Sequence, residues 1–233
     1  MTVPKAVVFD LGKVLVDFDY RIAARCLESR CAVARDKILE TIYPSPLLAR
    51  FETGWISPEQ FFHEVAEAIG YRGTFADFKV LFGDIFTPIG PMVELHSQLR
   101  ARGLPTFIFS NTNDLAVQFI RQRFPFFSGF NGYVYSYAHH AQKPDARLYA
   151  VLEQTSGRSG PDLLYIDDRP ENVAAGARRG WQVIRHESPA TTIAAVKNAG
   201  LIRPPHPARL PHPSRARANA HPAGHPPGNQ NRR

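Results

Sequence analysis

The sequence predicts an α/β fold, in which a parallel β-sheet carries helices on both faces and a small α-helical cap follows the first strand. Short runs rich in Val and Ile alternate with helical patterns over most of the chain, as expected of parallel strands joined by helices. The segment 18–88 interrupts this alternation with helical patterns alone. The chain has 233 residues, of which 44% are hydrophobic, and this is enough for a full buried core.

The first expected strand is Lys5–Leu11, a valine-rich run that ends in a carboxylate and then Gly12. Such a run is typical of a buried parallel strand followed by a sharp turn. Runs of the same kind are Leu104–Ser110, Gly132–Tyr137, Asp162–Asp168 and Gly180–Arg185. Helical patterns follow at Pro91–Arg102, Asp114–Phe124, Asp145–Ser156, Pro170–Arg179 and Ala190–Ala199. We therefore predict a Rossmann-like core formed by residues 1–17 and 89–202.

The segment 18–88 is predicted to be an α-helical cap with no convincing strand. Ser57, Pro58 and Gln60 together form a helix-start signal, and Gly70 is a typical helix end. Apolar residues fall on one face of this helix and of the helix after it (Phe61, Phe62, Val65, Ile69, then Phe75, Phe78, Leu81, Phe82 and Ile85). We interpret the aromatic residues as the core of a small helical bundle and not as a ligand site.

The C-terminal segment 203–233 is predicted to be disordered. It holds eight Pro, four His and six Arg, with almost no large apolar residue. Removing its six positive charges from the formal net charge of +7 leaves the rest of the chain at +1. Nucleic acid is therefore not an expected partner of the folded part. Contact with a polyanion through the basic tail stays open, and a solvated extension is the preferred interpretation.

Membrane insertion and secretion are not expected from this sequence. No stretch approaches the ~20 apolar residues of a membrane span, and the N-terminus lacks the features of a signal peptide. The two cysteines, Cys26 and Cys31, form no metal or disulfide framework. We expect two reduced thiols, with a single disulfide as the alternative. The sequence thus predicts a cytoplasmic protein without a membrane partner.

Polar residues end three of the predicted strands, and another group lies in a turn. The first strand ends at Asp10, the second at Ser110-Asn111, and another at Asp167-Asp168, while Lys143 precedes a helix. In an open parallel sheet, ligands bind beyond the carboxyl ends of the strands. One carboxylate at a strand end is often only a turn former, but the four groups together predict one site.

Phosphoryl transfer suits this set of side chains. A carboxylate can attack phosphorus to give an aspartyl-phosphate that water then hydrolyses. Because an anion must approach an anionic phosphate, a cation is needed between them, and Mg²⁺ bound by Asp10 and Asp168 supplies it. Ser110 and the amides after it can donate to phosphate oxygens, and Lys143 adds a positive charge. The predicted partner is a small phosphorylated substrate.

These residues resemble the four motifs of the haloacid dehalogenase (HAD) superfamily. Asp10-Leu11-Gly12-Lys13-Val14-Leu15 resembles the first, Ser110-Asn111 the second, Lys143-Pro144 the third, and the six residues from Asp167 to Asn172 the fourth. The likeness spans about residues 5–200, with the helical insertion between the first two motifs. Within the superfamily, the chain is most similar to bacterial α-glucose-1-phosphate phosphatases and to the phosphatase domain of soluble epoxide hydrolases.

The resemblance implies a role for each position. Asp10 is then the nucleophile and a ligand of Mg²⁺, which the backbone carbonyl of Gly12 and the carboxylate of Asp168 also bind. Asp167 either assists as a ligand or supports the site from behind. Ser110 holds the phosphate with Asn111 beside it, and Lys143 neutralises Asp10 and the phosphoryl group.

Gly12 departs from the pattern of many family phosphatases, which carry an acid–base Asp at this place. General acid–base help is typically worth about 10²–10⁴-fold. Either another group supplies the proton, or the substrate has a leaving group that needs less help, such as an anomeric hydroxyl. The bacterial sugar-phosphate phosphatase also has Gly here, so this change does not imply loss of activity. A positive φ at Gly12 would make an Asp there a strained substitution.

Three other functions compete with a phosphohydrolase. A haloacid dehalogenase uses the same nucleophile on carbon without metal, but the adjacent Asp167 and Asp168 would repel each other without a cation. A mutase would normally need the missing acid–base Asp. A non-catalytic or weakly active binding protein on the same scaffold gains weight from Gly12. The intact Asp10, Ser110, Lys143 and Asp168 count against it.

Several neighbouring residues also invite a functional interpretation. His139 and His140 either face the cleft or occupy a surface turn, and the surface turn is preferred. Lys13 either reaches the phosphate or faces solvent. Of the remaining polar residues, Asp17, Asp19, Asp145 and Asn172 are interpreted as helix-start residues, although Asn172 also suits a role in orienting the metal site.

Overall fold

The structure is a computed structural model that describes residues 2–202. Its central sheet has five strands in the order β5-β4-β1-β6-β7, and each neighbouring pair is parallel. Their bounds are β1 Ala6–Phe9, β4 Thr106–Ser110, β5 Gly132–Tyr135, β6 Leu163–Asp167 and β7 Gln182–Arg185. The predicted Rossmann-like α/β fold is confirmed, and each of the five predicted strands forms within a few residues of its expected limits.

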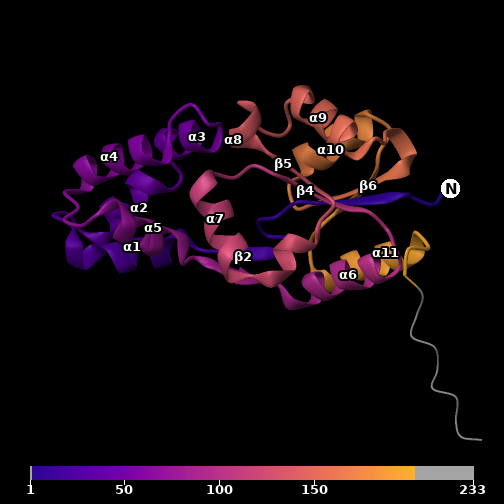
Figure 1. Ribbon diagram of the computed structural model, residues 1–233, viewed down its shortest axis with the longest axis horizontal. Coiled ribbons are helices and arrows are strands. Elements are labelled where there is room, and N and C mark those ends of the chain that lie inside the picture. The colour runs from indigo at the N-terminus through magenta and orange to yellow at the C-terminus, as the bar shows by residue number, and fades with distance from the viewer. Residues whose placement is uncertain (1, 203–233) are drawn as a thin grey trace, which may run out of the picture. The chain divides into compact units, whose positions relative to one another are not determined.

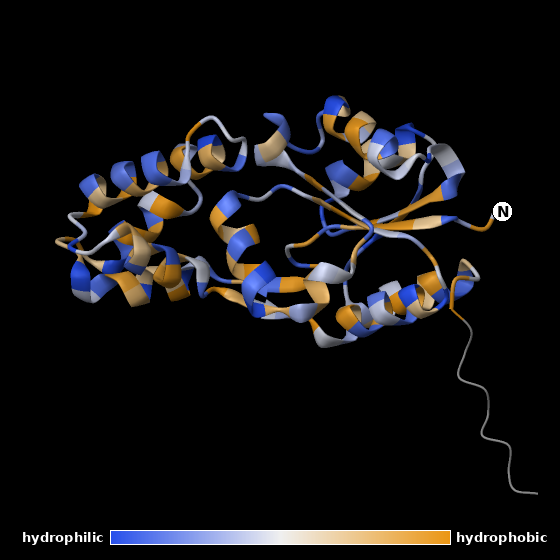
Figure 2. Cartoon of the chain, in the orientation of Figure 1, coloured by the Kyte–Doolittle hydropathy of each residue, from blue (hydrophilic) through white to orange (hydrophobic). Residues whose placement is uncertain are grey.

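Helices cover both faces of this sheet (Figure 1). On one face lie α6 (Gly90–Ala101) and α11 (Pro189–Asn198), and on the other lie α9 (Ala146–Ser156) and α10 (Pro170–Arg178). The alternation of side chains along β1 explains this layering. Val7 and Phe9 belong to one apolar cluster, whereas Ala6 and Val8 belong to the other. Figure 2 shows the apolar colouring concentrated on the strands and on the helix faces turned toward them.

Five helices between β2 (Val16–Phe18) and β3 (Phe86–Pro88) pack around an apolar cluster of their own. Their bounds are α1 Tyr20–Leu27, α2 Arg35–Ile42, α3 Pro46–Glu52, α4 Pro58–Ile69 and α5 Phe75–Gly83. The expected helix start is present in α4, where the Ser57 hydroxyl and the Gln60 side chain form a capping box and Gly70 ends the helix in the left-handed region. We call these five helices the cap, and the limits 18–88 stay an interpretation.

The expectation of no strand within 18–88 is wrong at both ends of that segment. Val16–Phe18 (β2) pairs antiparallel with Phe86–Pro88 (β3). Each strand has three residues, which is too short to show a period-two pattern, and the pairing joins segments far apart in sequence. The two-stranded ribbon brings the entrance and exit of the cap together beside the end of β1.

Both cysteines are free thiols in the structure. Among the described residues, no helix is long and apolar enough to cross a membrane. The expected disordered tail, 203–233, lies outside the described residues. Leu201 and Ile202 just before it are buried in the apolar cluster under α6 and α11.

Candidate active site

The carboxyl ends of three neighbouring strands place the predicted site residues at one edge of the sheet. In the parallel register, Phe9 lies beside Ile108 on β4 and Ile166 on β6. Asp10, which follows β1, therefore lies between the ends of these two strands. Ser110 is the last residue of β4, and Asp167 is the last residue of β6.

Lys143 is the centre of the buried polar network at this edge. Its side chain is 1% exposed, and its ammonium group donates to the Phe109 carbonyl at 2.8 Å and to Asp167 Oδ2 at 2.6 Å. The same Nζ lies 3.1 Å from Asp10 Oδ1. Burial lowers the pKa of Lys143, but the two carboxylates outweigh it and raise the pKa above its usual value. Lys143 therefore stays charged.

Asp167 serves Lys143 and not the cavity. Its Oδ2 accepts from Lys143, from the Tyr165 hydroxyl and from Asn172 Nδ2, while Oδ1 accepts from the Arg169 amide and from Asn172 Nδ2. Burial acts to raise the pKa of Asp167, yet Lys143 and these hydrogen bonds lower it overall. Both oxygens are thus occupied by protein donors, which favours the supporting role over the ligand role.

Asp10 and Asp168 remain as carboxylates directed at the cavity. One oxygen each from Asp10, Asp167 and Asp168 lies within 4.8 Å of the other two. Burial raises the pKa of Asp10 to about 7, with Lys143 opposing and the two neighbouring carboxylates adding to the rise. The pKa of Asp168 is also raised, by burial and then by Asp167. Two raised carboxyl pKa values at one point indicate that the protein alone does not neutralise this site.

The donor set fits a hydrated Mg²⁺, which takes carboxylate and carbonyl oxygens and keeps several waters. Asp10, Asp168 and Gly12 line the same cavity. Asn172 lines it as well, and its Oδ1 is buried without a hydrogen-bond partner among the described residues. An unpartnered acceptor in this place fits water bound to a cation. Asn172 lies in the first turn of α10, as expected, and also holds Asp167 through Nδ2.

The Ser110–Asn113 segment lines the site, and its polar groups also make hydrogen bonds that the sequence did not predict. The Asn111 amide exchanges two hydrogen bonds with the Lys143 backbone, from Nδ2 to the carbonyl at 3.1 Å and from the Lys143 N–H to Oδ1 at 2.8 Å. The amide of Thr112 donates to Ser136 Oγ at 2.9 Å. Asn111 therefore positions the loop that carries Lys143, and Ser110 remains the side chain available to a phosphate.

A cavity of about 450 Å³ opens over these groups. It is lined from the core by Asp10, Gly12, Lys143 and Asp168 and from the opposite side by Phe18, Tyr43 and Glu52. A smaller pocket of about 60 Å³ continues toward Ser110 and also includes Glu52. Tyr43 and Glu52 belong to the cap and were not predicted as site residues. A lone Glu near a helix end carries no sequence signal, since most such residues lie on a solvated surface.

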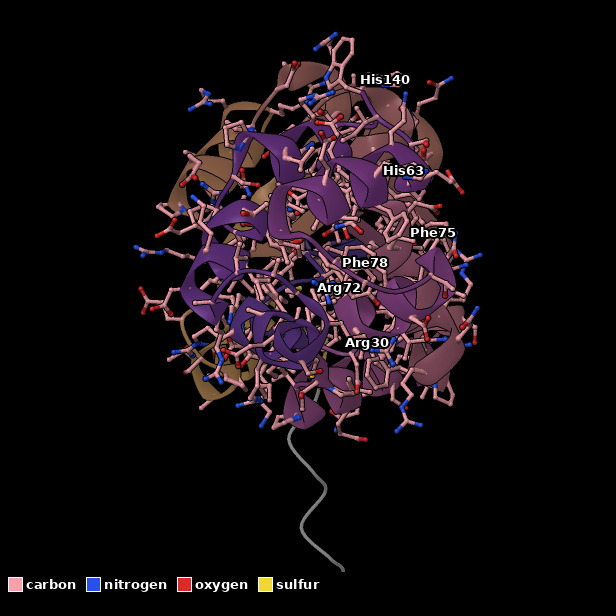
Figure 3. All side chains as sticks on the ribbon, turned by 90° about the vertical axis from the view of Figure 1, so that its left-hand side faces the viewer. Arg30, His63, Arg72, Phe75, Phe78 and His140 are labelled. Carbon is pink, nitrogen blue, oxygen red and sulfur yellow. The ribbon has the colours of Figure 1, made fainter. Side chains whose placement is uncertain are left out.

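The other residues singled out from the sequence have structural roles. His139 and His140 are exposed and do not line the cavity, and His140 lies at the outer edge of Figure 3 with Nδ1 3.2 Å from the Thr53 carbonyl. Asp19 and Asp145 cap α1 and α9. Lys13 lines the cavity and forms an ion pair with Asp17, which lies in β2 and does not cap a helix.

Gly12 does not have a positive φ. The left-handed residue in this turn is Lys13, at φ 60°. The obstacle to a side chain at Gly12 is instead Phe18, whose Cε1 would lie 2.9 Å from an added Cβ. The Phe18 ring is only partly buried. An Asp at position 12 therefore needs a shift of one aromatic ring and no backbone strain.

A family model described as haloacid dehalogenase-like hydrolase matches residues 4–180 of the chain. Two curated relatives are phosphatases by name. The sesquiterpene phosphatase astK of Aspergillus oryzae is 26% identical over 178 residues, or 76% of this chain and 86% of the relative. The D-ribitol-5-phosphate phosphatase of Bacteroides thetaiotaomicron is 22% identical over 193 residues, or 80% of this chain and 93% of the relative.

The fold also has relatives among solved structures. A HAD family enzyme from Bacteroides thetaiotaomicron, solved in complex with magnesium and inorganic phosphate, superposes with a TM-score of 0.66 at 18% sequence identity. The match covers 79% of this chain and 96% of the other. At this identity the likeness establishes the shared fold.

Proposed function

This chain belongs to the haloacid dehalogenase-like hydrolase family, and we propose that it is a Mg²⁺-dependent phosphohydrolase that cleaves a small phosphorylated metabolite through an aspartyl-phosphate. Sugar and polyol phosphates are the first substrates to test, because a named relative acts on D-ribitol 5-phosphate. The two named phosphatases and the magnesium and phosphate complex of a structural relative support both the activity and the metal.

One observation carries the proposal: the Asp10 carboxylate lies 3.1 Å from a buried lysine ammonium and shares a cavity with Asp168. Lys143 is held by Phe109 and Asp167, so its charge is fixed beside Asp10 before a substrate arrives. A preorganised cation of this kind stabilises the negative charge that develops during phosphoryl transfer.

The residues would act in sequence at one phosphorus atom. Mg²⁺, held by Asp10, Asp168 and the Gly12 carbonyl, would screen the negative charges of nucleophile and phosphate. An oxygen of Asp10 attacks phosphorus while the bond to the leaving oxygen breaks. Ser110 donates a hydrogen bond to a phosphate oxygen, and Lys143 stabilises the charge on the phosphoryl group. Water then attacks the phosphorus of the aspartyl-phosphate and releases inorganic phosphate.

The competing interpretations are less well supported. A metal-free dehalogenase gives no reason for a second carboxylate beside Asp10 that has a raised pKa and few protein donors. A non-catalytic scaffold gives no reason for a buried lysine poised at an otherwise reactive aspartate. Both alternatives predict that added Mg²⁺ does not stimulate phosphate release.

The test is a panel of phosphorylated metabolites assayed for phosphate release with Mg²⁺ and with chelator. We expect release with Mg²⁺, none in chelator, and none from Asp10→Asn. Asp162→Asn, which alters an exposed ion pair with Lys5, is the matched control and should keep full activity. Acid-quenched enzyme should carry phosphate on the peptide that contains Asp10. Equal rates in chelator and in Mg²⁺ would overturn the proposal.

A further inference from the structure

The cap presents one carboxylate, Glu52, to the cavity that holds the proposed nucleophile. Glu52 is the last residue of α3 and lines both the large cavity and the small pocket next to Ser110. Its carboxylate makes no hydrogen bond or ion pair with any other described residue. Arg169, which also lines the large cavity, forms its ion pair with Glu171 at 2.6 Å instead.

The backbone around Glu52 is fastened to the core. Ser136, the first residue of α8 (Ser136–His139), donates from Oγ to the Glu52 carbonyl at 2.5 Å and accepts from the Thr112 amide at 2.9 Å. Figure 1 shows α3 and α8 next to each other. Two residues later, an added Cβ on Gly54 would lie 2.1 Å from the Tyr137 carbonyl. Glycine at position 54 therefore permits a close approach of the cap backbone to the Tyr137 backbone, which any side chain would prevent.

These contacts fix the place of Glu52 relative to the strand ends. Ser136 binds at once the cap residue Glu52 and the backbone of Thr112, two residues beyond Ser110. The place of the Glu52 backbone relative to the end of β4 is thus set by the Ser136 hydroxyl, which hydrogen-bonds to both main-chain segments. The same cavity lacks a carboxylate at position 12, where Gly12 stands.

We propose that Glu52 is the catalytic acid and base of this site, taking the place of the carboxylate that is absent at Gly12; the inference rests on the proposed phosphohydrolase function. When Asp10 attacks phosphorus, the bond from phosphorus to the leaving oxygen breaks, and the Glu52 carboxyl gives its proton to that oxygen. The resulting Glu52 carboxylate takes a proton from the incoming water. The hydroxide oxygen bonds to phosphorus, the bond to Asp10 breaks, and Glu52 is again protonated.

The electrostatic surroundings suit a group that starts the cycle protonated. Burial raises the pKa of Glu52 to about 7, with Arg169 opposing the rise. A carboxyl group with a pKa near neutrality can donate and then accept a proton at the same pH. Besides Arg169, the ionisable groups that line the large cavity or the small pocket with Glu52 come from the core and from the cap. They are Asp10, Lys13, Lys143 and Asp168 from the core and Tyr20 and Tyr43 from the cap.

The experiment compares leaving groups in the wild-type protein, in Glu52→Gln and in the control Glu67→Gln, all with Mg²⁺. Glu67 is an exposed glutamate of α4 in the same cap. The substrates are p-nitrophenyl phosphate, whose leaving oxygen needs little protonation, and glycerol 3-phosphate, whose alkoxide needs much. In Glu52→Gln we expect kcat/KM to fall about 10²–10⁴-fold for the alkyl phosphate and less than about tenfold for the aryl phosphate. Glu67→Gln should match the wild type on both.

The same variant should show a burst of nitrophenolate, because loss of the base slows hydrolysis of the aspartyl-phosphate. An equal fall of kcat/KM on both substrates, or no fall on either, would overturn the acid role of Glu52 while leaving the phosphohydrolase function intact. Absence of the burst would remove Glu52 from the water step. A wild-type protein that releases no phosphate from any substrate with Mg²⁺ would instead overturn the proposed function itself.

Discussion

Replacing Lys143 with Met tests the buried charge network on which the site depends. The Met side chain keeps much of the volume but removes the ammonium group that lies 2.6 Å from Asp167 and 3.1 Å from Asp10. Two buried carboxylates then lose their cation. Breaking one partner of a buried ion pair typically costs about 3–5 kcal/mol, so we expect the free energy of unfolding to fall by about that amount at neutral pH. Phosphatase activity should disappear.

The pH dependence of this loss follows from the pKa of Asp167. In the native protein that pKa lies below its usual value of 3.8, so Asp167 contributes stability above this value and loses it as the pH falls through the lowered pKa. In Lys143→Met the lysine no longer opposes burial, so we expect the pKa of Asp167 to rise above 3.8. The variant then becomes less stable as the pH rises through the raised value. The difference between the two proteins should therefore grow from pH 4 to pH 7.

The assay is urea unfolding of both proteins at pH 4, 5.5 and 7, in chelator so that metal does not contribute. Lys5→Met is the matched control, because Lys5 pairs with Asp162 at 3.0 Å with its side chain 59% exposed. Its loss should cost less than about 1 kcal/mol. Adding Asp167→Asn to Lys143→Met should recover part of the stability. A difference that is small, or that does not change with pH, would refute the assignment of Lys143 as the clamp of these carboxylates.

Three further predictions concern the phosphate contact, the position of Glu52 and the C-terminal end of the core. Ser110→Ala should lower kcat/KM for phosphate esters by about 10²-fold, because a hydrogen-bond donor to the phosphate is lost. The control Ser128→Ala, at an exposed serine, should leave kcat/KM unchanged. Equal kcat/KM values in the two variants would exclude the Ser110 contact. Ser136→Ala removes hydrogen bonds to Glu52 and Thr112, so calorimetry should show that the free energy of unfolding falls by about 1–3 kcal/mol. The ratio of kcat/KM for the alkyl phosphate to that for the aryl phosphate should also fall. An unchanged ratio would show that Ser136 does not position Glu52. Leu201 is 6% exposed in the core, so Leu201→Ala should lower the free energy of unfolding in urea by about 2–5 kcal/mol. Deleting 203–233 should change it by less than about 0.5 kcal/mol. A larger loss on deletion would mean that the tail packs on the core.

The centre of the core sheet could be predicted because β1, β4 and β6 are mainly apolar and buried along their whole length. Ala6–Phe9 is wholly apolar, and in Leu163–Asp167 the one carboxylate comes only at the end of the strand. The cap helix α4 was equally accessible, since its capping box and its terminal glycine act within a few residues of sequence. Local rules therefore defined these elements. β2 and β3 were not predicted, because their pairing joins Val16 to Pro88 and no local sequence pattern contains such a contact.

The site was predicted in part, for a similar reason. Asp10, Ser110 and Asp168 were accessible because parallel strands bring their carboxyl ends to one edge, and Lys143 was accessible as the charged residue of the turn before α9. Glu52 was not, because it reaches this edge through a hydrogen bond to Ser136, 84 residues away in sequence. The side chain of Asn111 lines the cavity, as expected, but its two hydrogen bonds to the Lys143 backbone were not predicted. Such pairing depends on the exact approach of two loops, which residue types alone do not define.

Asp167 and Asp168 show why adjacent identical residues need not share a role. Successive side chains at a strand end point in opposite directions. Asp167 ends β6 and turns toward Lys143, Tyr165 and Asn172, whereas Asp168 lines the cavity. Their pKa values accordingly shift in opposite directions, down for Asp167 and up for Asp168. The inner carboxylate keeps the lysine charged and in place, and this leaves the outer one free to hold a cation opposite the same nucleophile.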